Sequence, residues 1–276
     1  GGGQTPGATI GNGRATAMQF AREGAEVLVA DRDLASAGET VVMIEDEGGR
    51  ASACHVDVTE EASLQELSRE VLRRYGKVDV LHNNVGMSLA AGDAAVEDIT
   101  TDAFDRIVDI NLRGMVLACK HFLPAMREAG SGAIVNISSM AAWRPYPYVA
   151  YKATKAAVVA FTEQLAQTNA RYNIRANVIL PGLMNTPMAI ESRVAAGTPR
   201  ERCFRTRQAR AARQKDGLGL GRRARGGFSR IGSCRIHHRR GTACGRRVER
   251  KLTLSVWLST SEGRYGANTN NRTRRP

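Results

Sequence analysis

The sequence predicts a doubly wound α/β domain with a mostly parallel sheet. Two observations predict it. From about residue 14 to residue 190, strand-like apolar runs alternate with stretches of helical periodicity, and a glycine-rich loop lies directly before the first helix. Strands separated by helices of this length are joined by right-handed crossovers. With 276 residues, 42% of them hydrophobic, the chain can bury one sizeable core.

Each predicted element has its own local signal. The apolar run AEVLVAD (25–31) is typical of a strand that is buried on both faces. The helix expected over 61–76 has apolar residues at helical spacing and ends on Gly76, a residue favoured at helix C-termini. The other expected helices cover 14–24, 34–49, about 101–129 and 149–172, and the other expected strands cover 50–58, 77–86, 132–139 and 174–182.

The loop PGATIGNGRA (6–15) places Gly7, Gly11 and Gly13 just before a helix. Glycines let a backbone approach a pyrophosphate, and the helix N-terminus favours its negative charge. Asp31 ends the next strand, 18 residues after Gly13, where a carboxylate accepts hydrogen bonds from ribose hydroxyls and repels a 2′-phosphate. A glycine turn without a nucleotide and a solvated turn acid are the alternatives.

Tyr151 and Lys155 form a Y-x-x-x-K pair in a segment of helical periodicity. At positions i and i+4 they share one helix face, so the ammonium lies near the phenol and would lower the pKa of Tyr151. Ser138 and Ser139 end the preceding strand, at the sheet edge where ligands bind, and a hydroxyl there can polarise a carbonyl. By spacing alone, a surface Tyr–Lys pair and strand-end turn serines are the alternatives.

Together these motifs resemble the short-chain dehydrogenase/reductase family, which has a Rossmann-type nucleotide-binding fold. The resemblance covers about residues 7 to 190. Besides the glycine loop and Asp31, it is carried by HVDV (55–58), NNVG (83–86), INLRG (110–114), NISS (136–139), YKATK (151–155) and LPGLMNTPM (180–188), in family order and spacing.

The resemblance implies a catalytic role for four positions. Tyr151 would be the general acid/base, and Lys155 would lower its pKa and hold the nicotinamide ribose. Ser139 would bind the reacting oxygen; Ser138 stays an alternative, because Ser139 lies 12 residues before Tyr151, one fewer than is usual. Asn111 would hold a water molecule and complete a proton relay with Lys155.

The resemblance also implies a cofactor site without a metal. Asp31 implies NAD rather than NADP, and Val85 stands where the family usually has alanine. The implied reaction transfers a hydride between NAD(H) and a secondary alcohol or ketone, with Tyr151 exchanging the proton. The expected cofactor-binding residues are Gly7, Gly11, Gly13, Asp31, Asp57, Val58, Asn84, Gly86, Tyr151, Lys155, Pro181, Gly182 and Thr186.

Two other functions stay open. One is an NADPH-dependent 3-oxoacyl reductase, against which Asp31 argues, and the other is a non-catalytic nucleotide-binding protein with a basic arm for nucleic acid. Trp143 and Tyr146 suggest an apolar or ring-bearing substrate, unless they serve the core or an interface. We expect a cytoplasmic protein without a membrane span, a small alcohol or carbonyl substrate and, from the resemblance, a homo-oligomer.

Both ends of the chain depart from the family pattern. GGGQTP (1–6) lacks the apolar strand expected before the glycine loop, in the centre of the sheet. Residues 1–190 hold 17 Lys and Arg against 22 Asp and Glu, whereas residues 191–276 hold 23 against 5. We therefore expect a nucleotide-binding and catalytic domain over 1–195 and a disordered basic tail over 196–276, with the first and last strands degraded or missing.

Three interpretations of the tail compete. Its cysteines and histidines have metal-ligand chemistry, but their spacing matches no standard zinc template. A nucleic-acid-binding arm fits the charge but lacks interleaved aromatic residues. We favour a single-nucleotide frame slip between about residues 195 and 208, because 237–247, read one nucleotide later with CGN arginine codons, can encode ITGxxLPVDGG, the family's last strand. The potential metal ligands are Cys234, His237, His238 and Cys244.

Overall fold

The computed structural model describes residues 1–205. Gly1–Cys203 form one compact unit, which extends slightly beyond the predicted domain over 1–195. The Cys/His cluster, most of the predicted basic tail and the displaced last strand lie outside the described residues. Within residues 1–205, no helix has the length and apolar character needed to cross a membrane, and no three His, Cys, Asp or Glu side chains gather as a metal site would require.

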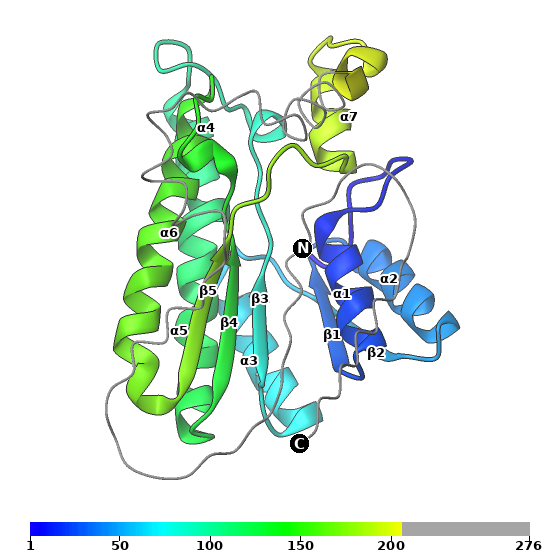
Figure 1. Cartoon of the computed structure of the whole chain (residues 1–276), viewed down its shortest axis with the longest axis vertical. Coiled ribbons are helices and arrows are strands. Elements are labelled where there is room, and N and C mark those ends of the chain that lie inside the picture. The colour runs from blue at the N-terminus through cyan, green and yellow to red at the C-terminus, as the bar shows by residue number, and fades with distance from the viewer. Residues whose placement is uncertain (206–276) are drawn as a thin grey trace, which may run out of the picture. The chain divides into compact units, whose positions relative to one another are not determined.

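The described chain alternates helices and parallel strands, as predicted (Figure 1). The strands are β1 (Glu26–Asp31), β2 (Arg50–His55), β3 (Val80–Asn83), β4 (Gly132–Ile137) and β5 (Ile174–Ile179). The main helices are α1 (Asn12–Arg22), α2 (Leu34–Asp46), α3 (Glu61–Tyr75), α4 (Thr101–Val108), α5 (Gly114–Glu128), α6 (Val149–Asn169) and α7 (Pro187–Ala195). Short helical turns are η1 (Leu89–Ala91), η2 (Asp109–Arg113), η3 (Met140–Ala142) and η4 (Ala170–Tyr172). The α/β fold class is confirmed.

Alternate residues of β1 face two different helical layers. Val27 and Val29 pack with the cluster formed by α1 and α2. Leu28 and Ala30 pack against the larger cluster built mainly from α3 and α5. Because successive side chains of a strand point to opposite faces, helices cover both faces of the sheet, as a doubly wound fold requires.

The sheet is split at the position where the sequence lacks a strand. β1 pairs only with β2, and β3, β4 and β5 form a separate parallel sheet. Between β1 and β3 lies a cavity of about 690 Å³, lined by residues of both strands and by Phe20. Phe20 meets His82 edge to face, with ring centroids 6.0 Å apart, and burial lowers the pKa of His82 to about 4. Within the described residues no strand precedes α1, in agreement with the sequence.

The predicted long helix over 101–129 is interrupted by one π-helical turn, η2. Such turns occur frequently at functional sites, and this one buries Asn111 completely. Gly114 follows the turn, and a Cβ there would lie 2.7 Å from the carbonyl oxygen of Val58. The π-turn therefore points Asn111 inward, and the glycine lets α5 pass close to the loop after β2.

Candidate active site

The loops after β3, β4 and β5 meet at the carboxyl edge of their sheet, because the three strands are parallel (Figure 1). The Met140 backbone N–H donates to the Pro181 carbonyl oxygen at 3.0 Å and joins the loops after β4 and β5. The Val149 N–H donates to the Ala94 carbonyl at 2.9 Å and joins the start of α6 to the loop after β3. Most predicted site residues lie on these three loops and on the first two turns of α6.

Tyr151 lies in the first turn of α6, where its phenol meets Ser139. A hydrogen bond with Ser139 favours the phenolate, and the Tyr146 ring packs 5.4 Å from the Tyr151 ring. Burial opposes the phenolate more strongly, so the pKa of Tyr151 lies above its ordinary value. The expected net lowering of the Tyr151 pKa by Lys155 is therefore wrong for this structure, because desolvation of the phenol is the largest effect.

Lys155 is buried directly below Tyr151, with 2% of its surface exposed. Its Nζ lies 5.6 Å from the centroid of the Tyr151 ring and donates to the Ile137 carbonyl oxygen at 2.8 Å. Burial lowers the pKa of Lys155 to about 8. The predicted pairing of phenol and ammonium on one helix face is present. It places beside the ring a lysine that loses its proton more readily than an exposed lysine does.

Asn111 connects the loop after β3 to α6. Its Oδ1 accepts a hydrogen bond from the Met87 N–H at 2.7 Å, and its Nδ2 donates to the Met87 carbonyl and to Thr154 Oγ1. Asn111 and Lys155 converge on Gly86, where a Cβ would lie 2.9 Å from the lysine Nζ and 3.5 Å from Asn111 Oδ1. Gly86 thus lies in close contact with both side chains.

The two serines after β4 do different things. Ser138 is buried, and its Oγ donates to the Lys155 carbonyl oxygen at 2.6 Å. The Ser139 Oγ accepts from the Ala141 N–H at 3.1 Å and also reaches the phenol of Tyr151. The structure therefore brings Ser139 to the tyrosine, while Ser138 is used to hold α6.

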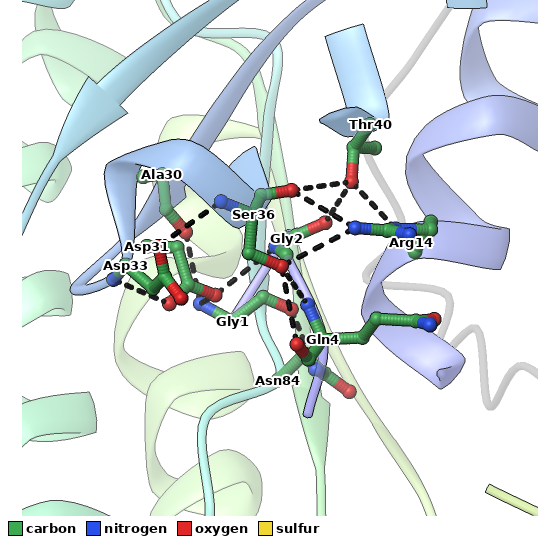
Figure 2. Close-up of polar contacts among 11 residues, drawn as sticks. Gly1, Gly2, Gln4, Arg14, Ala30, Asp31, Asp33, Ser36, Thr40 and Asn84 are labelled. Carbon is green, nitrogen blue, oxygen red and sulfur yellow. Dashed lines mark hydrogen bonds and ion pairs between the residues drawn. The ribbon is translucent and has the colours of Figure 1, made fainter. Parts of the chain in front are cut away.

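The first three residues form the start of the glycine loop and lie against the end of β1 (Figure 2). The Gly1 nitrogen and the Gly2 N–H both donate to the Ala30 carbonyl, at 2.9 and 3.1 Å. The Gly3 N–H donates to Asp31 Oδ2 at 3.0 Å. The sequence predicted the glycine loop over 6–15, with Gly7 as its first glycine; the three consecutive glycines at 1–3 were the signal for the earlier start.

Gly13 is required by a close approach between α1 and the first residue. A Cβ on Gly13 would lie 1.8 Å from the Gly1 carbonyl oxygen, which also accepts from Asn84 Nδ2 at 2.9 Å. Gly7 lies elsewhere, since its Cβ would be 2.9 Å from the Pro187 Cβ of α7. Gly13 and Asn84 therefore belong to the base of the loop, and Gly7 lies apart, beside α7.

Asp31 presents an ionised carboxylate at the carboxyl end of β1. Burial disfavours its charge, but the Gly1 amino group 3.4 Å away and the N–H groups of Asp33 and Gly3 outweigh burial, so the pKa of Asp31 is lowered. One fifth of its side chain remains exposed. A carboxylate acceptor beside a tight glycine cradle fits the ribose hydroxyls and pyrophosphate of a dinucleotide.

Arg14 lies beside Gly2 and Ser36 and holds this loop to α2, a role that the sequence does not reveal (Figure 2). It is 7% exposed, and its guanidinium donates to Thr40 Oγ1 at 2.9 Å, to the Ser36 carbonyl at 3.0 Å and to Glu39 at 2.7 Å. Ser36 Oγ in turn accepts from the Gln4 N–H at 2.9 Å. The cation thereby ties α1, α2 and the glycine loop together.

The remaining predicted cofactor residues lie on loops. The Asp57 carboxylate accepts from the N–H and the hydroxyl of Thr59, at 2.9 and 2.7 Å, so it shapes a local turn. Thr186 caps α7 by accepting from the Ala189 N–H at 3.4 Å. A Cβ on Gly182 would meet nothing within 4 Å, so close packing does not explain that glycine.

Asp93 is a buried acid at the site that the sequence alone did not single out. It is 4% exposed, and its carboxylate accepts from the N–H groups of Ala150 and Tyr151, both at 3.0 Å, and from Ser88 Oγ at 2.9 Å. These partners lie more than fifty positions further along the chain, except Ser88. No local pattern could therefore have indicated this contact.

Comparisons with known proteins agree with this geometry. Residues 6–196 match the family model described as short chain dehydrogenase. The chain is 38% identical over 183 residues to an uncharacterised oxidoreductase of Bacillus subtilis (strain 168), with 66% of each chain covered. It is 37% identical over 213 residues to cis-4-hydroxycyclohexanecarboxylate dehydrogenase of Sinomonas cyclohexanicum, covering 76% of this chain and 80% of that one.

Solved structures show the same relationship. A short-chain dehydrogenase/reductase from Burkholderia xenovorans superposes with a TM-score of 0.72 at 38% identity, covering 76% of this chain and 79% of that one. A 7α-hydroxysteroid dehydrogenase complexed with NADH and 7-oxoglycochenodeoxycholic acid superposes at 0.60 with 33% identity, covering 63% and 67%. The family match and the site geometry together show that this chain belongs to the short-chain dehydrogenase family, whose members are oxidoreductases acting on CH–OH groups.

Proposed function

We propose that this protein transfers a hydride between NAD(H) and a ring-bearing secondary alcohol or ketone, with Tyr151 as general acid/base. The observation that carries the proposal is the convergence of Ser139, Tyr151, Lys155 and Asn111 at one sheet edge. A substrate oxygen between the Ser139 hydroxyl and the Tyr151 phenol would meet a hydrogen-bond donor and a proton donor together. A ring-bearing substrate is supported by the hydroxycyclohexane and steroid names of the two relatives above.

The protein's own groups suit proton transfer to a ketone. The raised pKa of Tyr151 keeps the phenol protonated at neutral pH, as an acid must be. After the proton leaves, the Ser139 hydroxyl and the Lys155 ammonium stabilise the phenolate. With a pKa of about 8, Lys155 can then give a proton to the phenolate and regain one from water near neutral pH. When bound, the nicotinamide supplies the hydride.

Replacing the phenol tests the catalytic assignment. We expect Tyr151→Phe to lose about 10²-fold or more in kcat while NADH binding changes little, because only the transferable proton is removed. Tyr148→Phe is the matched control, since Tyr148 packs beside Tyr146 at the start of the same helix. Turnover of a cyclohexanol and cyclohexanone panel is followed by nicotinamide absorbance. Full turnover in Tyr151→Phe would refute the assignment, and NADH binding without turnover in the parent protein would favour the non-catalytic alternative.

Asp31 supports NAD(H) over NADP(H). An ionised carboxylate accepts hydrogen bonds from the ribose hydroxyls of NADH and repels the 2′-phosphate of NADPH. The same repulsion argues against an NADPH-dependent 3-oxoacyl reductase. We expect NADH to bind at least about tenfold more tightly than NADPH, a difference of about 1.4 kcal/mol. Asp31→Ser should narrow this difference when both dissociation constants are measured by fluorescence titration. Equal affinities in the parent chain would contradict the cofactor assignment.

We further propose that the protein acts in the cytoplasm on small molecules and as a homo-oligomer. Support for the first comes from its cysteines, since Cys54 and Cys119 form no disulfide within the described residues. Support for the second comes from the family alone. Size-exclusion chromatography with light scattering tests the oligomeric state, and a monomer would contradict it.

A further inference from the structure

Helix α7 lies over the candidate active site. It packs against η1, and Ser88, which directly precedes η1, has its hydroxyl 3.3 Å from the Tyr146 hydroxyl (Figure 1). The Tyr146 ring packs in turn 5.4 Å from the ring of Tyr151. A continuous series of contacts thus leads from α7 through η1 and Tyr146 to the phenol, which places α7 close to the candidate active site.

Arg193 is a cation on α7 without an acidic partner in the described part of the chain. Its Nη1 donates to the Ala189 carbonyl oxygen one turn earlier at 2.6 Å, and the side chain is half-buried. By contrast, Arg200 makes a two-pronged ion pair with Glu191, at 2.6 and 2.8 Å. The charge of Arg193 reaches the site, since it lowers the pKa of both Tyr146 and Tyr151 against the larger effect of burial.

The acid that acts on the same two tyrosines already has hydrogen-bond partners. Asp93 faces the same tyrosines, but its two oxygens accept three hydrogen bonds, from Ser88 and from the first N–H groups of α6. It makes no ion pair with Arg193. The guanidinium therefore keeps donors that no carboxylate of residues 1–205 uses, and these donors can bind the anionic group of a ligand.

Exposed apolar side chains occur on the loops after β4 and β5 and at the start of α7. Trp143 follows β4 and is 48% exposed, Leu183 follows β5 and is 43% exposed, and Met188, in the first turn of α7, is 38% exposed. The two loops are joined by the hydrogen bond between Met140 and Pro181. Large exposed apolar side chains beside a site are typical of a surface that binds an apolar ligand.

We infer that the substrate carries a carboxylate, bound by Arg193, on an apolar ring that packs against Trp143, Leu183 and Met188. This inference rests on the proposed function and names the substrate class for the same site. A guanidinium forms paired hydrogen bonds with a planar carboxylate, a geometry that a neutral ring substituent cannot use. Arg193 is thus a specificity-determining residue, and Tyr151 remains the group that exchanges the proton.

The test compares two ketones that differ only in charge, 4-oxocyclohexanecarboxylate and its methyl ester, with NADH and the full chain. We expect kcat/KM to be at least about tenfold higher for the acid, because a charge-assisted pair contributes more than about 1.4 kcal/mol. Arg193→Gln should remove this preference by raising KM for the acid, with the ester unchanged in KM. Arg193→Lys should restore part of it, and Arg200→Gln, which breaks the ion pair with Glu191, is the matched control.

The other outcomes are decisive as well. An equal kcat/KM for both ketones in the parent protein, or an equal loss on both in Arg193→Gln, would overturn the inference. A change in kcat alone would also overturn it, since it would show that Arg193 acts through the phenol. If neither ketone is reduced, the proposed function fails. The anion site at Arg193 is then tested separately by calorimetry, as binding of cyclohexanecarboxylate. Loss of that binding in Arg193→Gln supports the anion site, and no binding to the parent protein refutes it.

Discussion

Lys155 combines its proposed catalytic role with a cost in stability. Its ammonium is buried against a single carbonyl oxygen, and burial lowers its pKa from 10.5 to about 8. Below pH 8 the lysine is protonated in both folded and unfolded chains, so the folded state carries the full desolvation cost, about 3 kcal/mol. Between pH 8 and 10.5 the folded chain has released the proton and the unfolded chain has not, so stability rises with pH.

This pKa shift predicts that removing the charge stabilises the fold and ends catalysis. Lys155→Met should raise the free energy of unfolding at pH 7 by about 1–3 kcal/mol, the lost hydrogen bond offsetting part of the gain. The gain should shrink as pH approaches 10.5. Lys152→Met is the matched control, because Lys152 donates at 2.9 Å to the carbonyls of Ala141 and Arg144 and its loss should destabilise. Urea denaturation at pH 7 and pH 9.5 measures both, and a pH-independent change in Lys155→Met would contradict this account.

Helix α6 obtains its N-terminal acceptor from a distant loop. Tyr148 at its N-cap offers no side-chain hydrogen bond, and Asp93 supplies the carboxylate instead. A helix N-terminus carries partial positive charge, which a carboxylate acceptor complements. The same acid holds the backbone of Tyr151 in place and, through its charge, contributes to the raised pKa of the phenol.

The cap at α6 predicts a coupled change in stability and pH dependence. Asp93→Asn should lower the free energy of unfolding by about 1–2 kcal/mol, because one backbone donor loses its acceptor. It should also lower the apparent pKa of Tyr151 in the pH profile of kcat, because a negative charge is removed. Asp102→Asn, an exposed acid in the first turn of α4, is the control. A destabilised variant with an unshifted profile would limit Asp93 to a structural role.

At the scale of elements, the sequence predicted most boundaries to within a few residues. Gly76, for example, adopts φ 72° and its N–H donates to the Leu72 carbonyl, as expected of a helix end. The π-turn around Asn111 was not predicted, because hydrophobic periodicity does not separate a five-residue wide turn from the α-helix around it. The Asp93 cap was not predicted either, since it depends on contacts across more than fifty residues.

At the scale of the whole molecule, the cavity between β1 and β3 predicts a response to chain extension. The Gly1 nitrogen donates a hydrogen bond to the Ala30 carbonyl oxygen near the carboxyl end of β1. An extended segment placed before Gly1 would therefore enter the cavity parallel to β1. A six-residue apolar extension should bury its side chains in the cavity and raise the free energy of unfolding by about 2 kcal/mol or more. Each kcal/mol corresponds to about 2–4 °C in a domain of this size, so Tm should rise by at least about 4 °C. A Gly/Ser extension of equal length is the control. Equal melting temperatures for the two would contradict this prediction.

The origin of the basic tail is open to a direct test. We propose a single-nucleotide slip between about residues 195 and 208, which would restore the family's last strand in the alternative frame. Resequencing the coding region should show the shifted frame. An intact-protein mass that matches the written sequence would refute the slip and favour the basic arm, whose signature is salt-dependent nucleic-acid binding.

The sequence by itself determined the order of helices and strands and the types of residue at the site. Apolar periodicity and short motifs such as YKATK are local properties, so they can be recognised in the sequence without knowing how the chain packs. Only the tertiary structure decided which serine meets Tyr151, that residues 1–3 lie against the end of β1, and that Asp93 caps the helix that carries Tyr151. It also decided the direction in which the Tyr151 pKa moves. These outcomes depend on burial and on contacts between distant segments, and neither exists until the chain has folded.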